Sequence, residues 1–194
     1  MKKTKQKNIG FKRLTVMLIV ILLMFAAYNL VWYFLKYQPY HRLCADFQKS
    51  DEGLRGERYS YSDTDYTYSI KMPAYLSFEG GFISVSSNKK ISQYAENGAE
   101  VQQSSCTIFI WPQIMKETKY GAAIFEQDNS YMLYIDKEIN YVANDSELPA
   151  ETKSNEEIIS NHYNEISEIM NAVDKMWGDI WINIAFELYN THTA

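Results

Sequence analysis

Glycine and proline are scarce in this chain, with 8 and 4 among 194 residues, while hydrophobic residues make up 46%. This composition excludes collagen-like and intrinsically disordered chains, because it supplies ample apolar surface to bury and few backbone breakers. Basic residues are in deficit, with 19 Lys and Arg against 24 Asp and Glu and a formal charge of −5. The deficit argues against a basic nucleic-acid-binding protein, so we expect no nucleic acid among its partners.

Acidic residues are missing altogether from the first 35 positions, where every charge is basic. The six basic residues there are Lys2, Lys3, Lys5, Lys7, Lys12 and Arg13. The rest of the chain therefore holds 13 basic residues against all 24 acidic ones, a formal charge of −11. From that sum we expect the rest of the chain to repel teichoic acids and anionic lipid headgroups and to favour cationic or neutral partners.

An uncharged apolar run, LTVMLIVILLMFAAYNLVWYFL at residues 14–35, follows the basic cluster. As a helix it would be about 33 Å long, enough to cross the roughly 30 Å hydrocarbon core of a bilayer. We therefore predict one transmembrane helix that contacts the lipid bilayer through residues 14–35. A cleaved signal peptide is the alternative. It is disfavoured because the run exceeds the usual apolar core of such peptides, and because Met24 and Phe25 fit poorly before the only small-residue pair, Ala26-Ala27.

The flanks of the apolar run predict its orientation. The positive-inside rule places the basic tail, residues 1–13, in the cytoplasm. Aromatic residues gather at the other end, where amphipathic rings prefer the boundary between acyl chains and headgroups. The residues that we predict at the two membrane interfaces are Lys12, Arg13, Trp32, Tyr33 and Tyr37. The expected location is the cell membrane of a bacterial envelope, as a single-pass signal-anchor protein with its C-terminal domain extracytoplasmic.

Two parts are expected beyond the membrane, a juxtamembrane spacer at residues 36–58 and one domain at 59–194. The spacer carries many charges and scattered apolar residues, which favours a tether over a binding segment. The domain is long enough to bury a modest core. The predicted fold class is α+β: an N-terminal transmembrane helix, then one domain in which an antiparallel sheet packs against a long C-terminal amphipathic helix.

Aromatic or β-branched residues that alternate with small or polar ones predict a sheet of four to six strands. The strand segments are 59–61, 66–70, 82–85, 106–111, 120–125 and 131–135, with 139–143 as an extension. In 106–111, one face holds Cys106, Ile108 and Ile110, and the other holds Thr107, Phe109 and Trp111. Residues 86–105 are mostly polar and predict a loop, with a short helix around 91–95.

Apolar residues at helical spacing predict a long helix near 155–177 whose apolar stripe packs on the sheet. Ser154 and Glu157 form a capping-box pattern at its start. The tail at residues 179–189 fits two patterns. Its alternation indicates a strand, whereas its tryptophans and isoleucines also continue a helical stripe, and β-branching slightly favours the strand.

The segment YTYSIKMP at residues 66–73 resembles the opening hairpin of PsbP-like domains, in which a tyrosine-containing strand runs into a proline. The resemblance covers residues 59–177 at the level of architecture. It departs from the family pattern after Pro73, where Ala74-Tyr75-Leu76 stand in place of a frequent tryptophan. The resemblance implies a scaffold for binding and assembly rather than an activity, and no functional residue is transferred from it.

Residues that could carry catalysis or bind a metal are few, and the sequence has no GxSxG, Walker A or SxxK motif. His162 and Glu165 could share a metal at i,i+3 spacing, but no second histidine accompanies them. A solvent-facing polar edge of the helix is therefore favoured. Asp63 and Asp65 favour a hydrogen-bonded turn over a calcium loop, which would need further oxygen ligands. We identify no catalytic, cofactor-binding or metal-binding residue and expect no cofactor.

The two cysteines, Cys44 and Cys106, leave two interpretations open. A disulfide between them would close a long loop and contribute roughly 4 kcal/mol in the chain-entropy model. Two buried or reduced thiols are slightly favoured, because one cysteine lies in the spacer and the other in a predicted strand.

Two functional hypotheses follow from the sequence. The favoured one is a non-catalytic, membrane-anchored external domain that binds or assembles with another membrane or envelope protein. Of the 16 tyrosines, Tyr28 and Tyr33 lie in the spanning helix, and most of the others should fill the sheet's faces. Those on the sheet face away from the helix are the binding candidates. The alternative is an anchored cell-envelope hydrolase with an unidentified carboxylate-based site. A closed cluster of titratable groups would favour the hydrolase, and a flat aromatic face would favour the binding domain.

Overall fold

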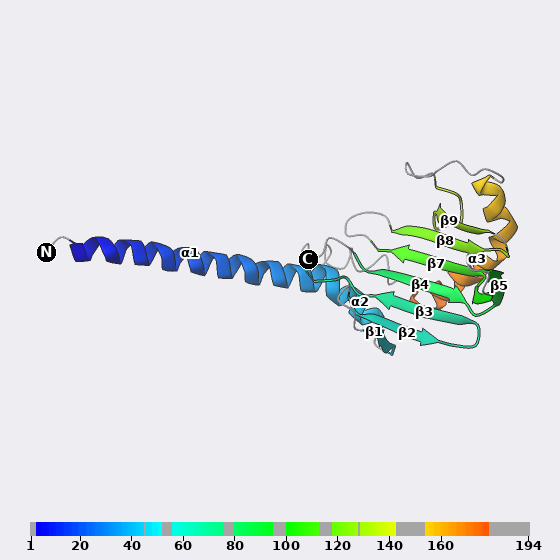
Figure 1. The fold of residues 1–194 in the computed structure, drawn as a ribbon, viewed down its shortest axis with the longest axis horizontal. Helices are drawn as coiled ribbons and strands as arrows, with labels where there is room; N and C mark the ends of the chain where they lie inside the picture. The colour runs from blue at the N-terminus through cyan, green and yellow to red at the C-terminus, as the bar shows by residue number, and fades with distance from the viewer. Residues whose placement is uncertain are drawn as a thin grey trace, which may run out of the picture. The chain divides into compact units, whose positions relative to one another are not determined.

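The computed structural model describes residues 3–44, 46–51, 56–75, 80–94, 100–112, 118–127, 129–142 and 154–178. The chain divides into two compact units, Met1–Pro39 and Tyr40–Ala194. The first is helical, and the second contains the sheet and the C-terminal helix (Figure 1). The prediction of an α+β chain with a long apolar N-terminal helix is confirmed.

The N-terminal unit consists of α1 (Lys3–Trp32) and a π-helical turn, η1 (Tyr33–Tyr37), and the chain continues into α2 (Gln38–Leu43). An 18-residue window in this helical stretch has a mean hydropathy of 2.5, and none of the window is buried. By length and composition the helix can cross a membrane. It is compatible with a membrane anchor or with a signal sequence.

Seven strands form one sheet in the C-terminal unit, in the order β1-β2-β3-β4-β7-β8-β9, and every neighbouring pair is antiparallel. The strands are β1 (Gln48–Asp51), β2 (Arg58–Ser62), β3 (Tyr66–Lys71), β4 (Phe82–Ser87), β7 (Cys106–Trp111), β8 (Lys119–Phe125) and β9 (Ser130–Ile135). The predicted strand segments near 59, 66, 120 and 131 are confirmed, and they form two hairpins, because β2 pairs with β3 and β8 pairs with β9.

The structure differs from the sequence predictions at residues 86–105. The short helix expected around 91–95 is wrong, because β5 (Lys90–Tyr94) pairs with β6 (Glu100–Ser104) in a separate two-stranded ribbon. The ribbon is rich in polar residues and so lacks the apolar alternation that predicts a strand. For example, Ser92 lies opposite Gln102 and accepts a hydrogen bond from its side chain. A two-stranded ribbon buries little surface, so its strands need no apolar alternation.

Strand β1 falls within the stretch expected to be spacer, so the sheet begins earlier in the chain than the pattern indicated and has seven strands rather than four to six. Residues 139–142 are not a full strand, but they extend the sheet in part: Tyr141 forms an isolated antiparallel bridge with Ile135, and the Val142 N–H donates to the Tyr134 carbonyl at 2.9 Å. The tail prediction for 179–189 lies outside the described residues.

Helix α3 (Asn155–Trp177) begins and ends close to the predicted limits. The Ser154 hydroxyl accepts a hydrogen bond of 3.2 Å from the backbone N–H of Glu157, which satisfies one of the free donors at the helix start. Gly178 follows the last turn with φ of 59°, a conformation that glycine adopts at little cost. The buried residues of α3 are Ile158, Ile159, Ile166, Ile169, Met170, Ala172, Val173 and Trp177.

The core lies between α3 and one face of the sheet, and α3 packs on β4 and β7 along that face (Figure 1). Strand register places Tyr68, Val85 and Ile108 side by side on this face, and the row continues to Ala122 and Leu133. The segment before β1 closes one end of the core. The Tyr40 hydroxyl donates to the carbonyl of Gly81 at 2.8 Å, and the Trp177 indole donates to the carbonyl of Leu43 at 3.2 Å.

Candidate functional site

The residues predicted at the membrane interfaces occupy the two ends of the N-terminal helical stretch. Lys12 and Arg13 are exposed near its start, and Trp32 lies 19 residues beyond Arg13, about 28 Å at the rise of an α-helix. The Trp32 and Tyr37 rings are 5.5 Å apart, and those of Tyr33 and Tyr37 are 5.9 Å apart. The three aromatic residues thus form one cluster, on the side of the apolar run away from the two cations.

The face of the seven-stranded sheet opposite α3, here called the open face, is the first candidate for a binding surface. Among the described residues, no helix or strand is packed on it. The register of the strands places its residues in rows that run across the sheet. The face carries an aromatic cluster, a set of hydroxyl side chains and three cations, which are described in turn.

The aromatic cluster of the open face consists of Phe82, Phe109, Trp111 and Tyr134. Ring centroids are 5.9 Å apart for Phe82 and Phe109, 5.8 Å for Phe109 and Trp111, and 6.0 Å for Trp111 and Tyr134. The Phe109 and Trp111 planes are within 16° of parallel. The four half-buried rings therefore make a continuous aromatic surface across β4, β7 and β9.

Gly121 of β8 provides the space for the largest of these rings. A Cβ at this position would meet the six-membered ring of Trp111 at 2.9 Å and the Met132 methyl at 3.2 Å. The Trp111 ring therefore lies over the glycine, against the sheet. The ring stays half-buried there, so part of it remains available for contact with a ligand.

Hydroxyl side chains cover the part of the open face next to the aromatic cluster. Strand register aligns Ser60, Ser69 and Ser84 in one row and Ser62, Thr67, Ser86 and Thr107 in the next. Ser62 and Thr67 are hydrogen-bonded at 3.0 Å, as are Ser86 and Thr107 at 2.9 Å. We call these seven residues the hydroxyl ladder. The Thr67 hydroxyl also donates to the Asn88 side chain at 2.8 Å, and Thr107 is only 8% exposed. A hydroxyl has one donor and two acceptor sites, so the capacity for a ligand lies with the serines of the ladder.

The charged residues that β2, β3, β4, β7, β8 and β9 place on the open face are all cations, whereas on the edge strand β1 Asp51 pairs in register with Arg58. Arg58 pairs in register with Lys71, Lys71 with Phe82, and Trp111 with Lys119. The Lys71 ammonium lies 5.7 Å from the centroid of the Phe82 ring, a cation–π distance. On these six strands no aspartate or glutamate shares the face with the three cations.

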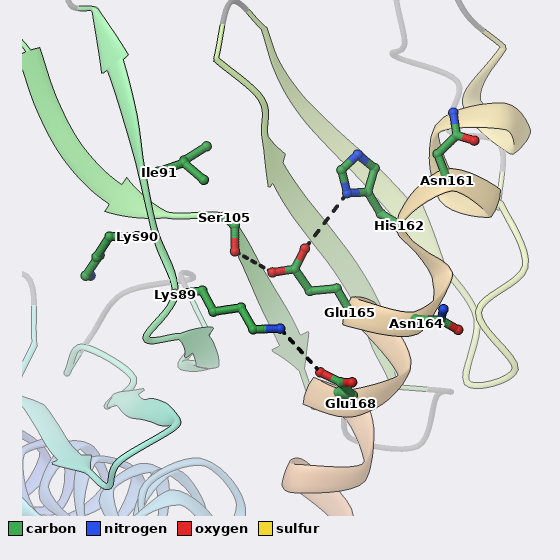
Figure 2. A pocket seen from close by; sticks show the side chains of 9 residues that line it. All are labelled: Lys89, Lys90, Ile91, Ser105, Asn161, His162, Asn164, Glu165 and Glu168. Atoms are coloured by element: carbon green, nitrogen blue, oxygen red, sulfur yellow. Dashed lines mark hydrogen bonds and ion pairs between the residues drawn. The ribbon is translucent and has the colours of Figure 1, made fainter.

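A cleft beside α3 is the second candidate site (Figure 2). It has a volume of about 480 Å³ and lies between α3, the start of β5 and the β6–β7 junction. Glu165 is its central group: it accepts a hydrogen bond from the Ser105 hydroxyl, and one of its oxygens lies 3.9 Å from Nδ1 of His162. Nε2 of His162 lies 3.2 Å from a carboxylate oxygen of Glu126. Lys89 and Glu168 form an exposed ion pair of 3.8 Å at the rim.

The cleft joins titratable groups without the geometry of a familiar catalytic set. The Ser105 hydroxyl is bonded to a carboxylate instead of an imidazole, so the serine–histidine pair of a serine hydrolase is not formed here. Within the described part of the chain, no three His, Cys, Asp or Glu residues are placed to hold a metal ion. The contacts of Ser105 and Glu126 instead fix α3 to the β6–β7 junction and to the end of β8.

His162 differs from its sequence interpretation as a solvent-facing edge. Its side chain is 21% exposed and lies between the carboxylates of Glu126 and Glu165. The i,i+3 spacing indicated that Glu165 lies near His162, but nothing in the sequence indicated that Ser105 and Glu126 belong to the same cluster. They lie 60 and 36 residues away from their partners in the chain, and no spacing rule links such positions.

The two cysteines are both free and buried, in agreement with the favoured interpretation. Cys106 is 0% exposed, and burial, with a smaller contribution from the charge of Glu165, raises the pKa of its thiol to about 12. Burial also raises the pKa of Cys44, whose thiol contacts the carbonyl of His41 at 3.3 Å. Neither thiol is therefore an activated nucleophile, because the thiolate is disfavoured at both positions.

Asp63 has the turn role that was predicted for it. Its Oδ1 accepts hydrogen bonds from the backbone N–H groups of Asp65 at 2.9 Å and Tyr66 at 2.7 Å, between β2 and β3.

The tyrosines are also mostly structural. Tyr61 and Tyr68 lie on the α3 face, where Tyr68 packs edge-on against Trp177 at 5.6 Å. Tyr134 is the tyrosine that the described strands place on the open face.

Comparisons with protein-family models, curated proteins and solved structures found no match to this chain. The resemblance to PsbP-like domains therefore stays an expectation from the sequence.

Proposed function

We propose that the chain is a single-pass, membrane-anchored binding or assembly domain that acts outside the cytoplasm without catalysis. The observation that carries the proposal is the aromatic cluster of the open face. Four contiguous rings on a face that no described helix or strand covers form the kind of surface that proteins use for interaction.

The anchor supports the same function. In the proposed topology, residues 14–35 hold the protein in the cell membrane, with residues 1–13 in the cytoplasm and the second unit outside. A single anchor confines the domain to a thin layer at the membrane surface and raises its effective concentration toward membrane and envelope components. A weak interaction through the open face would then suffice for assembly.

Site-specific crosslinking in intact cells tests the proposal directly. A photoreactive amino acid replaces Tyr134 in the aromatic cluster or, as the matched control, Tyr163 on α3, which is 48% exposed. We expect crosslinks to an envelope component from position 134 and none from 163, and Trp111→Ala should abolish those from 134. Equal yields at both positions, or no product from 134, would contradict binding through the open face.

The cleft beside α3 favours a second candidate function, an envelope hydrolase in which Glu165 is the general base. The Ser105–Glu165–His162–Glu126 contacts provide a carboxylate held in place by its neighbours. Turnover of an envelope polymer by the full chain, lost in Glu165→Gln and kept in Glu168→Gln, would make the hydrolase the better assignment.

A further inference from the structure

The open face combines three features in a fixed arrangement, and together they indicate one class of ligand. The register places Arg58 beside Lys71 and Lys71 beside Phe82, and it places Trp111 beside Lys119. Ile83 pairs with Ile110, so Phe82 and Trp111 are the next facing positions along β4 and β7. One row across five strands therefore reads cation, cation, ring, ring, cation. At about 4.8 Å between strands, the row is roughly 19 Å long.

We propose that the open face binds an acidic polysaccharide. Sugar rings have apolar C–H faces that stack on aromatic rings and hydroxyls at their edges, and acidic sugars add a charge at intervals along a linear chain. In the row, Phe82 and Trp111 would stack on the sugar ring faces. The cations would pair with the acidic groups of the sugar; they are Arg58, Lys71 and Lys119. The inference rests on the proposed function and names the ligand class for the same surface.

The hydroxyl ladder supports a sugar ligand over a protein partner. The centre of a protein–protein interface is depleted of polar and charged groups and is filled by large apolar side chains. On this face seven serine and threonine side chains of β2, β3, β4 and β7 lie beside the aromatic cluster, in two rows that continue into Phe109 and Tyr134 and into Ala123 and Met132. Short hydroxyl side chains present donors and acceptors at a flat surface, which suits a ligand whose edges are hydroxyl groups.

The distribution of charge supports an acidic ligand. The net charge of −11 beyond the first 35 residues alone would predict that an anionic polymer is repelled. On β2, β3, β4, β7, β8 and β9 the charged residues of the open face are Arg58, Lys71 and Lys119, although Asp51 of the edge strand β1 pairs in register with Arg58. Charges more than about 10 Å away are largely screened at physiological salt. The cations of the open face therefore determine whether an anionic polymer binds there, and the acidic surplus on the other surfaces disfavours binding elsewhere on the domain.

Binding assays with defined polymers test the proposal. The full chain, inserted into nanodiscs of zwitterionic lipid, is presented with polygalacturonate, dextran sulfate or neutral dextran at 0.15 M salt. We expect binding to at least one acidic polymer and an affinity for dextran at least tenfold lower. The double variant Arg58→Gln/Lys119→Gln should weaken the acidic interaction several-fold, with a smaller effect at high salt. Trp111→Ala should weaken it about tenfold, the scale of one lost stacking contact.

Two matched variants serve as controls. Lys137→Gln removes an exposed lysine that follows β9, and Tyr163→Ala removes an exposed ring on α3; both should bind the polymers as the wild type does. Arg58 and Lys119 are exposed, so their substitution tests the proposal without a risk to folding.

The outcomes separate this inference from the proposed function. The polysaccharide assignment would be overturned if the protein bound neither acidic polymer or bound neutral dextran equally well. Unchanged affinity in the Arg58/Lys119 variant would overturn it as well. So would capture of vesicles of anionic phospholipid in place of the polymers. If crosslinks from position 134 to a membrane protein persist in that case, binding through the open face stands and only the ligand class falls.

Discussion

The Trp111 ring occupies the space directly above Gly121, so that a single added methyl group on the glycine would meet ring carbons at 2.9 Å. This relationship joins β7 to β8 across the open face and sets the height of the tryptophan above the strands. Aromatic rings that cover a glycine on a neighbouring strand recover packing that the glycine itself lacks. Here the same contact leaves the indole half-buried on the open face.

Gly121→Ala should displace Trp111 and lower the free energy of unfolding by about 1–3 kcal/mol, the usual cost of overpacking. The measurements are denaturant titration and the tryptophan emission spectrum. Gly80→Ala is the matched control, because a Cβ at that exposed glycine would meet nothing within 4 Å. Unchanged stability and emission in Gly121→Ala would contradict the contact.

Ile169→Asp should lower the free energy of unfolding by several kcal/mol, because Ile169 is 0% exposed and an unpaired charge there is costly to bury. Ser160→Asp places the same charge on an exposed position of the same helix and should change stability by no more than about 0.5 kcal/mol. Chemical denaturation of both variants checks the prediction. If both variants are equally stable, the buried stripe of α3 does not contribute to the core.

Tyr40→Phe should cost about 1–3 kcal/mol of stability, since it leaves the Gly81 carbonyl without its 2.8 Å buried partner. Tyr163→Phe changes an exposed hydroxyl on α3 and should be neutral. A loss confined to Tyr40→Phe would show by measurement that the segment before β1 is part of the folded unit. Neutral behaviour of both would assign no stabilising role to this contact.

The pKa of Cys106, raised to about 12 from an ordinary value of 9.0, predicts a loss of stability in alkali. A thiol whose pKa is higher in the folded state keeps its proton there after the unfolded chain has lost it. Its stabilisation is therefore complete below pH 9 and disappears as the pH rises toward 12. Cys106→Ala should reduce the slope of unfolding free energy against pH in this range, and equal slopes in variant and wild type would contradict the buried thiol.

The topology prediction is tested by protease treatment of intact cells. We expect residues beyond 41 to be digested and the N-terminal segment to be protected, because the basic flank is retained in the cytoplasm. Protease treatment of lysed cells controls for intrinsic resistance of the folded unit. Protection of the large unit in intact cells only would reverse the proposed orientation.

Local pattern was sufficient for the long elements of this protein. The uncharged apolar run at 14–35 is longer than any strand needs and so indicates a helix, and the limits of α3 follow from Ser154, the apolar repeat and Gly178. The alternation in 106–111 also predicted that Phe109 and Trp111 share a face opposite Cys106, because successive side chains of any strand point to opposite sides.

Tertiary structure decided what pattern could not encode. The polar β5–β6 ribbon and β1 are strands because of their pairing partners, not because of their own alternation. Glu165 meets Ser105 and His162 meets Glu126 because α3 folds back over the sheet. Strand order brings Arg58, Lys71, Phe82, Trp111 and Lys119 into one row, although they are spread over 62 positions of the chain. The sequence determines side-chain chemistry and local period, whereas the register of non-adjacent strands sets which groups act together.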